Sequence, residues 1–231
     1  MSLRDLYLSC FGRAKRQCLL SLAVLLSACA TAPKNEPPVA VPENVVTTPA
    51  TTASTAAAPE LPAEAQQQFD KALSLLKAGQ GTAAAQQLQQ LASTYPTATG
   101  PLINLGLIEL KAGRHEQAAT FFKSALQRDA KSVAANNYLG VSYRNLGRFQ
   151  DAEAAYQAAI AADDTYAAAH LNLGILYDLY LQKPEQALSE YQRYQSLQAQ
   201  PDAKAANWIK ELTARVNADK KAKSAAGGAT P

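Results

Sequence analysis

The stretch that decides the fold is residues 135–159, which read ANNYLGVSYRNLGRFQDAEAAYQAA. Its Gly140 belongs to a series of small residues that recurs every 34 positions, at Ala72, Gly106, Gly140 and Gly174. A second small residue keeps the same step at Ala84, Ala118 and Ala152, and reappears one residue late at Ala187. A fixed period of this length is typical of an array of two-helix units, in which each unit buries its apolar face only against its neighbours.

The spacing has a steric explanation. Where two helices cross, a side chain larger than alanine would force them apart, so glycine or alanine is expected at that point on each helix. Leucine and aromatic residues at helical spacing fill the volume around the crossing. Gly79, Gly113 and Gly147 lie where the first helix of a unit should end, as a left-handed cap requires. The sequence therefore predicts an all-α fold.

The same positions resemble the tetratricopeptide repeat, which has Leu-Gly and an aromatic residue on its first helix and alanine and a large residue on its second. Unit 133–166 matches it with Leu139, Gly140, Tyr143, Ala152, Tyr156 and Ala159. Units 99–132 and 167–201 match it too, and a weaker copy covers 65–98. Unit 167–201 has one extra residue within 180–183, which predicts a longer helix or turn there. The resemblance implies a right-handed solenoid of about four units over 61–201.

After the repeats, the stretch 202–217 places apolar residues on one helical stripe beside Trp208. A repeat array without a cap exposes an apolar face, so we expect a capping helix here, with Trp208 packing against the last unit. Lysines followed by alanine and glycine fill residues 218–231, which we expect to form a disordered tail.

The first 28 residues are typical of an export signal. Basic residues precede an apolar run over 18–28 that is about 11 residues long, whereas a membrane-spanning helix needs about 20. The run ends in Leu26-Ser27-Ala28-Cys29, which resembles the lipobox of bacterial lipoproteins. The resemblance implies cleavage before Cys29, lipidation of Cys29 with acyl chains such as palmitate, and, because Ala30 is not an aspartate, transfer to the Gram-negative outer membrane. An uncleaved signal anchor is the alternative.

Proline, threonine and alanine dominate residues 29–60. Such a stretch cannot pack a core, so we expect a disordered, extended tether that holds the repeats away from the lipid. All three cysteines, Cys10, Cys18 and Cys29, lie in the first 29 residues. The repeat region therefore cannot build a disulfide, a cysteine zinc site or a cysteine nucleophile.

The formal net charge of +3 is misleading, because four cations and one anion precede Cys29. Removing them from the 22 Lys and Arg and the 19 Asp and Glu leaves 18 of each sign. A nucleic-acid-binding protein concentrates basic residues on one face, so we expect no nucleic-acid partner.

Catalytic and metal-binding patterns are missing from the sequence. The two histidines, His115 and His170, are 55 residues apart and are interpreted as an exposed polar residue and as a core or groove residue. Asp163 and Asp164 are better explained by helix capping than by acid/base chemistry. We therefore expect no enzyme, no catalytic residues, no cofactor, no metal and no small-molecule substrate.

In tetratricopeptide proteins the first helices of the units line a groove that holds the partner. The resemblance assigns this role to Ile103, Leu107, Leu110, Asn137, Val141, Arg144, Leu171, Ile175 and Asp178. A mixed apolar surface with one cation and one anion suits a helix or an extended segment with an apolar stripe. Leu107, Val141 and Ile175 replace the asparagine of the known carboxylate clamp, so that clamp is not expected. The alternative is that the apolar members pack one unit on the next.

A lipid anchor combined with such repeats resembles two groups of bacterial proteins. The first is the pilotins of type IV pili and secretion systems, which help an outer-membrane channel to assemble. The second is the adaptors that hold peptidoglycan hydrolases or synthases in place. We expect a non-enzymatic, periplasm-facing scaffold of the first kind, with the second as the alternative.

Overall fold

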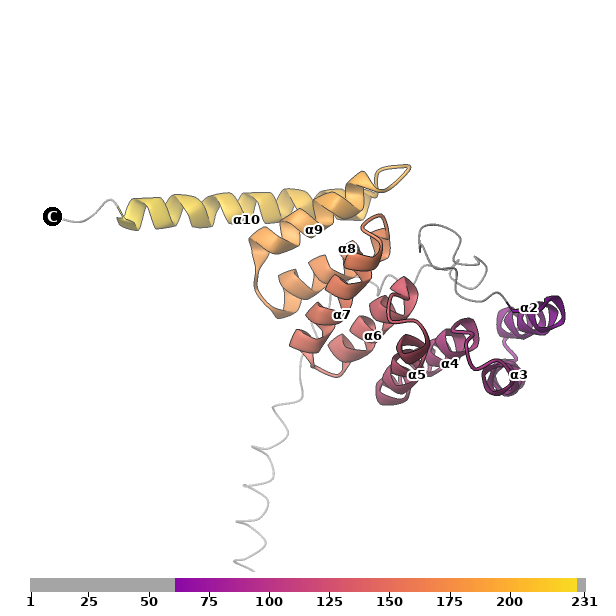
Figure 1. Ribbon diagram of the computed structural model, residues 1–231. Helices are drawn as coiled ribbons and strands as arrows, with labels where there is room; N and C mark the ends of the chain where they lie inside the picture. Colours follow the sequence, from indigo (N-terminus) through magenta and orange to yellow (C-terminus); the bar gives the residue numbers. More distant parts are fainter. Residues whose placement is uncertain (1–60, 228–231) are drawn as a thin grey trace, which may run out of the picture. The chain divides into compact units, whose positions relative to one another are not determined.

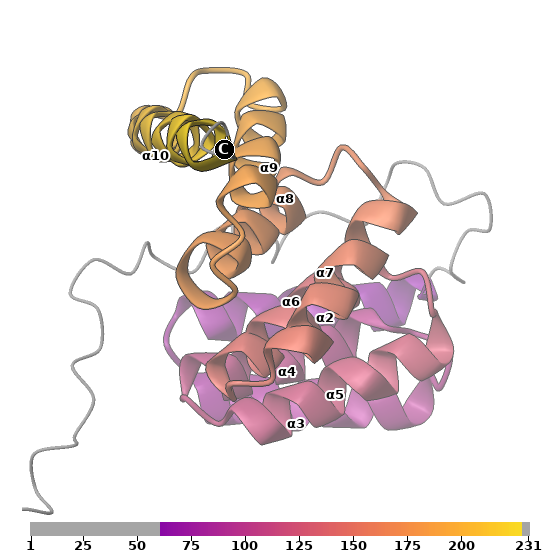
Figure 2. The ribbon, with the colours of Figure 1, turned by 90° about the vertical axis from the view of Figure 1, so that its left-hand side faces the viewer.

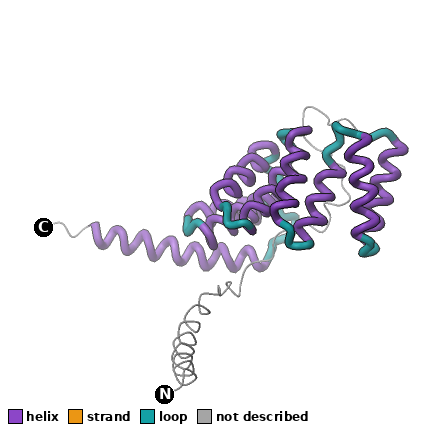
Figure 3. Tube along the Cα trace, turned by 90° about the horizontal axis from the view of Figure 1, so that it is seen from below, coloured by secondary structure: helices purple, strands orange, loops and turns teal. Residues whose placement is uncertain are grey.

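The computed structural model describes residues 61–227. The predicted signal peptide, the lipidation site at Cys29, the tether up to residue 60 and residues 228–231 lie outside this range. Between 61 and 227 the chain forms helices joined by short loops and contains no strand (Figure 3).

The helices form four consecutive pairs followed by one longer helix (Figure 1). The pairs are α2 (Ala63–Lys77) with α3 (Gly81–Thr94), α4 (Gly100–Lys111) with α5 (His115–Arg128), α6 (Val133–Asn145) with α7 (Phe149–Ala162), and α8 (Ala167–Ile175) with α9 (Pro184–Ser196). A π-helical turn, η1 (Leu176–Tyr180), continues α8, and the last helix is α10 (Ala203–Gly227). The last three pairs fall within the predicted units 99–132, 133–166 and 167–201, whereas α2 begins two residues before the predicted unit 65–98.

The two helices of a pair come close because the predicted glycines lie under aromatic rings. A Cβ atom on Gly140 would lie 2.5 Å from Cε1 of Tyr156. A Cβ atom on Gly106 would lie 2.5 Å from Phe122, and one on Gly174 would lie 2.6 Å from Tyr191. In the first pair Ala72 and Ala84 are both fully buried. The eight small residues of the repeat pattern are therefore all buried in the packed helices.

The first helix of each later pair contacts several neighbours. Helix α6 packs against α7, against α5 of the preceding pair, and against the first helices α4 and α8. The helices α4, α6 and α8 therefore form a continuous layer, while the second helices lie outside it. Figure 2 shows α8, α9 and α10 grouped at one end of the repeats.

The turn inside the fourth pair differs from the other three. Gly79, Gly113 and Gly147 end their helices with φ values of +75°, +73° and +74°. One period after Gly147, with the extra residue counted, stands Gln182, whose φ is +52°. The π-helical turn η1 precedes it, and a single π-helical turn, with its i→i+5 hydrogen bonds, can accommodate one inserted residue. The extra residue predicted within 180–183 thus lengthens the end of the first helix.

Helix α10 covers the last pair by packing against α9. Ala205, Leu212 and Val216 are buried on one stripe, and the Trp208 ring lies 5.5 Å from that of Tyr191. The helix ends at Gly227, beyond the expected end at 217, so residues 218–227 are helical and not a disordered tail. Alanine and lysine favour helix even where nothing packs on them, and this propensity extends α10 past its contacts. Figure 1 shows this end projecting beyond α9.

Within the range 61–227 there is no helix both long and apolar enough to cross a membrane.

Candidate protein-binding face

The nine residues predicted to line the groove lie on one layer, formed by α4, α6 and α8 with η1. We call them the first-helix face. Six are buried, with exposed fractions of 0–9%: Ile103, Asn137, Val141, Arg144, Leu171 and Ile175. Leu107, Leu110 and Asp178 are half-buried. The buried apolar members are what packing between units requires, and the partly exposed leucines leave apolar surface on α4. The groove assignment stays a prediction.

A hydrogen bond between two asparagines joins α6 to α8: Asn137 belongs to this face, and Asn172 follows its member Leu171. Asn172 Nδ2 donates a hydrogen bond to Asn137 Oδ1 at 3.0 Å, and both side chains are 0% exposed. The remaining amide groups, Asn137 Nδ2 and Asn172 Oδ1, have no hydrogen-bond partner in the part of the chain that the structure describes. One donor and one acceptor are thus left unused in a buried position.

Arg144, seven residues after Asn137 on α6, is 2% exposed. None of its guanidinium nitrogens has a hydrogen-bond partner among residues 61–227. The guanidinium carbon lies 5.8 Å from the centre of the Tyr180 ring, so the charge is placed against an aromatic ring. Burial raises the pKa of Tyr156 and Tyr191, and the positive charge of Arg144 partly opposes this rise, so both phenols lie near the guanidinium.

Asp178 is the only acidic residue among the nine residues of the first-helix face, and it is paired with a basic residue of α10. Asp178 forms an ion pair with Arg215 of α10. In the same two units Glu153 accepts hydrogen bonds from Lys183 at 3.1 Å and from the Tyr177 hydroxyl at 2.9 Å. These carboxylates are therefore occupied and do not neutralise Arg144.

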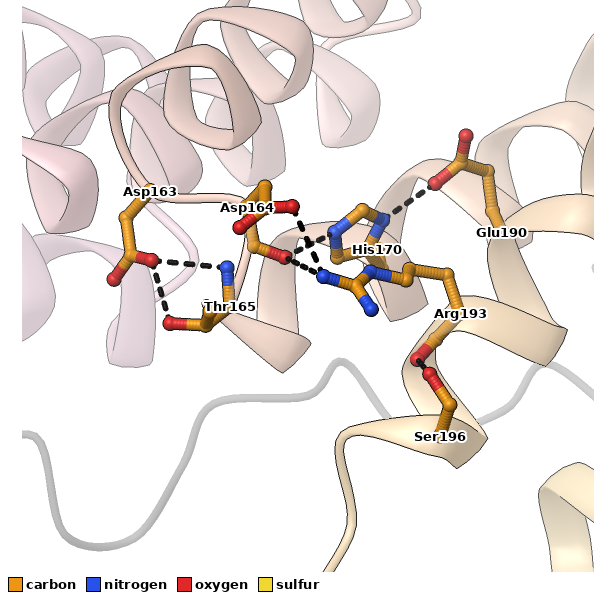
Figure 4. Close-up of polar contacts among 7 residues, drawn as sticks. All are labelled: Asp163, Asp164, Thr165, His170, Glu190, Arg193 and Ser196. Carbon is orange, nitrogen blue, oxygen red and sulfur yellow. Dashed lines mark hydrogen bonds and ion pairs between the residues drawn. The ribbon is translucent and has the colours of Figure 1, made fainter.

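His170, on α8, is 5% exposed, and its side chain points toward Glu190 of α9 (Figure 4). Its Nδ1 is 2.7 Å from Glu190 Oε2, and its Nε2 is 2.9 Å from the carbonyl oxygen of Asp164. Burial alone would lower the pKa of His170, but the bonds to Glu190 and to the Asp164 carbonyl outweigh it and raise the pKa. Arg193 binds the Asp164 carboxylate at 3.0 Å. The contacts tie the loop between α7 and α8 to α9, which is a structural role.

His115 begins α5 and is half-buried rather than fully exposed. Asp163 accepts hydrogen bonds from the main-chain N–H and the hydroxyl of Thr165 at 2.9 and 2.6 Å. Thr165 lies before α8, whose N-cap is Tyr166 and has no side-chain cap hydrogen bond, so Asp163 orders the loop and does not cap the helix as predicted. No group of three or more His, Cys, Asp or Glu side chains that could hold a metal occurs between residues 61 and 227.

Sequence reasoning missed two residues of this region. Asn172 was not among the predicted groove residues, although it stands two periods after Asn104, which is also buried on a first helix. The recurrence of asparagine two periods apart is the sequence signal that could have identified Asn172. Tyr180 was missed because its placement against Arg144 depends on the π-helical turn, which the tetratricopeptide pattern does not contain.

Comparison with known proteins identifies the repeats. Tetratricopeptide-repeat profiles match residues 69–135 and 109–171. The structure of MamA residues 41 to the end from Desulfovibrio magneticus RS-1 has a TM-score of 0.58 and 20% identity, covering 71% of this chain and 92% of that one. Another crystal structure of MamA has a TM-score of 0.58 and 22% identity, covering 69% and 86%. None of the curated proteins matches the sequence.

A thermophilic tetratricopeptide protein of Thermus thermophilus is similar as well, with a TM-score of 0.54 and 20% identity over 66% of this chain and 82% of that one. At these identities the likeness concerns the fold. It confirms the all-α tetratricopeptide solenoid predicted from the sequence. Residues 69–171 match tetratricopeptide repeats, and a fold of this type implies a scaffold for protein–protein interaction.

Proposed function

We propose that this chain is a non-enzymatic lipoprotein of the Gram-negative outer membrane that faces the periplasm and helps an envelope machine, such as a type IV pilus or a secretion channel, to assemble. The lipobox-like Leu26-Ser27-Ala28-Cys29 supports the anchor, and the Pro-rich residues 29–60 support a tether. The layer of first helices supports the docking of a protein segment. The alternative is an adaptor that docks or regulates peptidoglycan hydrolases or synthases.

The observation that carries the docking proposal is the first-helix face itself. It spans three consecutive units and combines the partly exposed Leu107 and Leu110 with buried polar groups that no described residue satisfies. An apolar strip beside a few fixed polar groups is the usual composition of a peptide-binding surface.

Mass spectrometry of the proteins that co-purify with the tagged, lipidated chain from gently solubilised membranes tests the function. The Cys29→Ala variant is the unanchored control. An outer-membrane channel or pilus subunit in the complex supports the assembly role, and deletion should then abolish channel multimers or surface fibres. Peptidoglycan enzymes in its place would support the adaptor role. If neither class of protein is found in the complex, both the assembly role and the adaptor role are refuted.

Two substitutions separate docking from folding. Leu107→Glu combined with Leu110→Glu changes half-buried residues, so we expect loss of the partner with the helicity and melting temperature nearly unchanged. Val141→Glu is the matched comparison, because Val141 is only 1% exposed and an unpaired buried charge destabilises the fold. If the leucine double variant unfolds as Val141→Glu does, these leucines belong to the core.

A further inference from the structure

The loop between α7 and α8 is held by a side chain of the helix that follows it, and the loop between α5 and α6 is held in the same way. Nε2 of His170 lies 2.9 Å from the carbonyl oxygen of Asp164, six residues earlier. One period back, Nδ2 of Asn136 donates to the carbonyl oxygen of Ala130 at 3.2 Å, also six residues earlier. His170 and Asn136 therefore occupy equivalent positions in consecutive units and make the same contact.

The two loops match in a second hydrogen bond. Oδ1 of Asp129 accepts the main-chain N–H of Lys131 at 2.9 Å, and Oδ1 of Asp163 accepts that of Thr165 at 2.9 Å. The loops differ in the side chain that binds the carbonyl, because a histidine can take up a proton near neutral pH and an asparagine cannot.

The surroundings of His170 favour the protonated ring. Its Nδ1 is 2.7 Å from Oε2 of Glu190 on α9, whereas the third unit has Ala155 at the position of Glu190, with the extra residue of the fourth unit counted. Arg193 of α9 opposes protonation, and it lies 3.0 Å from the carboxylate and 3.3 Å from the carbonyl oxygen of Asp164 (Figure 4). Burial and Arg193 lower the pKa of His170, but the two hydrogen bonds of the ring raise it overall.

Loss of the proton breaks one of the two contacts of the ring. Both partners are acceptors, and a neutral imidazole has only one N–H. A hydrogen bond to a carboxylate is stronger than one to a carbonyl, so the remaining hydrogen stays on Nδ1, toward Glu190. The lone pair of Nε2 then faces the carbonyl oxygen of Asp164, and the loop loses a bond that joins the third unit to the fourth.

We propose that His170 is a pH-dependent latch between the third and fourth units. At low pH the protonated ring holds loop 163–166 against α8 and α9, and at higher pH the ring releases the carbonyl and the loop loosens. Loop 129–132 keeps its bond at either pH, because Asn136 holds it. The first-helix face crosses this junction from α6 to α8, so the latch controls how firmly the two parts of the face are held together, whichever partner binds.

Amide hydrogen exchange of the full chain in mild detergent, at about pH 5 and about pH 9, tests the latch. Exchange is expressed as protection factors, which remove the intrinsic effect of pH on the rates. We expect the protection of residues 163–166 to fall about fivefold at the higher pH, the factor that corresponds to the loss of one hydrogen bond. The protection of residues 129–132 should stay the same. Equal changes in both loops, or no change in 163–166, would overturn the proposal.

His170→Asn is the matched variant, because it gives the fourth unit the side chain that holds the loop of the third. The fold should be retained, and the protection of residues 163–166 should no longer depend on pH. A pH dependence as large as that of the wild type would show that His170 is not the latch.

Glu190→Gln distinguishes a latch from a histidine with only a structural role. The substitution removes the charge that faces Nδ1, so the ring should lose its proton at a lower pH and the loop should loosen at a lower pH. Proton NMR follows the ring directly, since the chain has only two histidines and His170→Asn identifies their signals. The midpoint of loop loosening should coincide with the titration of His170 and shift with it in Glu190→Gln. Midpoints that do not shift together would contradict the proposal.

Discussion

Gly140 is the residue on which the third unit depends. Its Cα lies so close to the Tyr156 ring that a Cβ would be 2.5 Å from Cε1, and the ring is 0% exposed and has no room to move. We expect Gly140→Ala to lower the free energy of unfolding by about 1–3 kcal/mol, the usual cost of overpacking a core. Urea denaturation followed by circular dichroism measures the change.

Gly81→Ala is the matched control, since nothing lies within 4 Å of the added Cβ and alanine favours helix. Its stability should stay the same or rise slightly. A second change, Tyr156→Leu, made in the Gly140→Ala background should restore part of the loss by removing the ring. Equal losses for the two glycine substitutions would mean that backbone entropy, and not the crossing, sets the effect.

His170 predicts a pH-dependent stability. Glu190 and the Asp164 carbonyl are both acceptors, so the protonated ring alone can donate to both, while Arg193 of α9 is the cation that opposes this charge. The folded pKa is raised above the unfolded value of about 6.5. The stabilisation is therefore fully present below that value and is lost as the pH rises through the folded pKa.

The measurement is the melting temperature of the chain and of His170→Gln between pH 5 and pH 9. The wild-type chain should lose more stability than the variant as the pH rises above about 6.5. Glu190→Gln should weaken the same pH dependence, because it removes the carboxylate that faces Nδ1. Parallel curves for the wild type and both variants would contradict a protonated His170 in the folded state.

Helix α10 shows which part of an element is held by packing. Its first half buries Ala205, Leu212 and Val216, whereas every described side chain from Asn217 to Ala225 is exposed. We expect Leu212→Ala to lower the free energy of unfolding by about 2–5 kcal/mol, as for other buried leucines. Deletion of residues 219–231 should change it by no more than about 0.5 kcal/mol.

Thermal unfolding of the two variants checks this difference, and far-ultraviolet circular dichroism should show a loss of helix for the truncation without a loss of cooperativity. A large destabilisation by the truncation would mean that the exposed half of α10 has a contact that its burial does not reveal.

The sequence predicted the helices of this fold well because their spacing is set by a local steric rule. A small residue must recur where helices cross, and Gly106, Gly140 and Gly174 are visible without any structure. The π-helical turn at 176–180 and the left-handed Gln182 follow from how one extra residue is accommodated, and several solutions to that problem exist. The end of α10 was missed because no steric signal stops an exposed, lysine-rich helix.

The candidate site was less predictable than the fold. The nine positions of the face follow from the repeat register, yet the register does not say which side chains bury polar atoms. The link from Asn137 to Asn172 joins residues in different units, and the place of Arg144 beside Tyr180 depends on the unusual fourth turn. Contacts between units depend on the rotation of each unit against the next, which a single sequence does not encode in its spacing.

The repeat array as a whole should open unevenly, because each unit is stabilised by its neighbours. The third unit has them on both sides, and α6 buries ten residues. Within residues 61–227 the first unit has one neighbouring unit, and α2 buries only Ala65, Ala72 and Leu73. We therefore expect native-state amide hydrogen exchange to be slowest in α6 and α7 and much faster in α2 and beyond Val216 in α10.

Gly140→Ala provides the internal test of this gradient. The substitution destabilises the third unit, so the amide exchange rates of α6 and α7 should rise toward those of the two ends of the array. The exchange of α2 is already fast and should change little. In a chain that opens only as one cooperative block, the slowest amides of α2 and α6 would share one opening free energy and would shift together in the variant. Amide-resolved exchange rates at a single pH and temperature distinguish the two cases, because only nearest-neighbour coupling predicts a change confined to the units that contact Gly140.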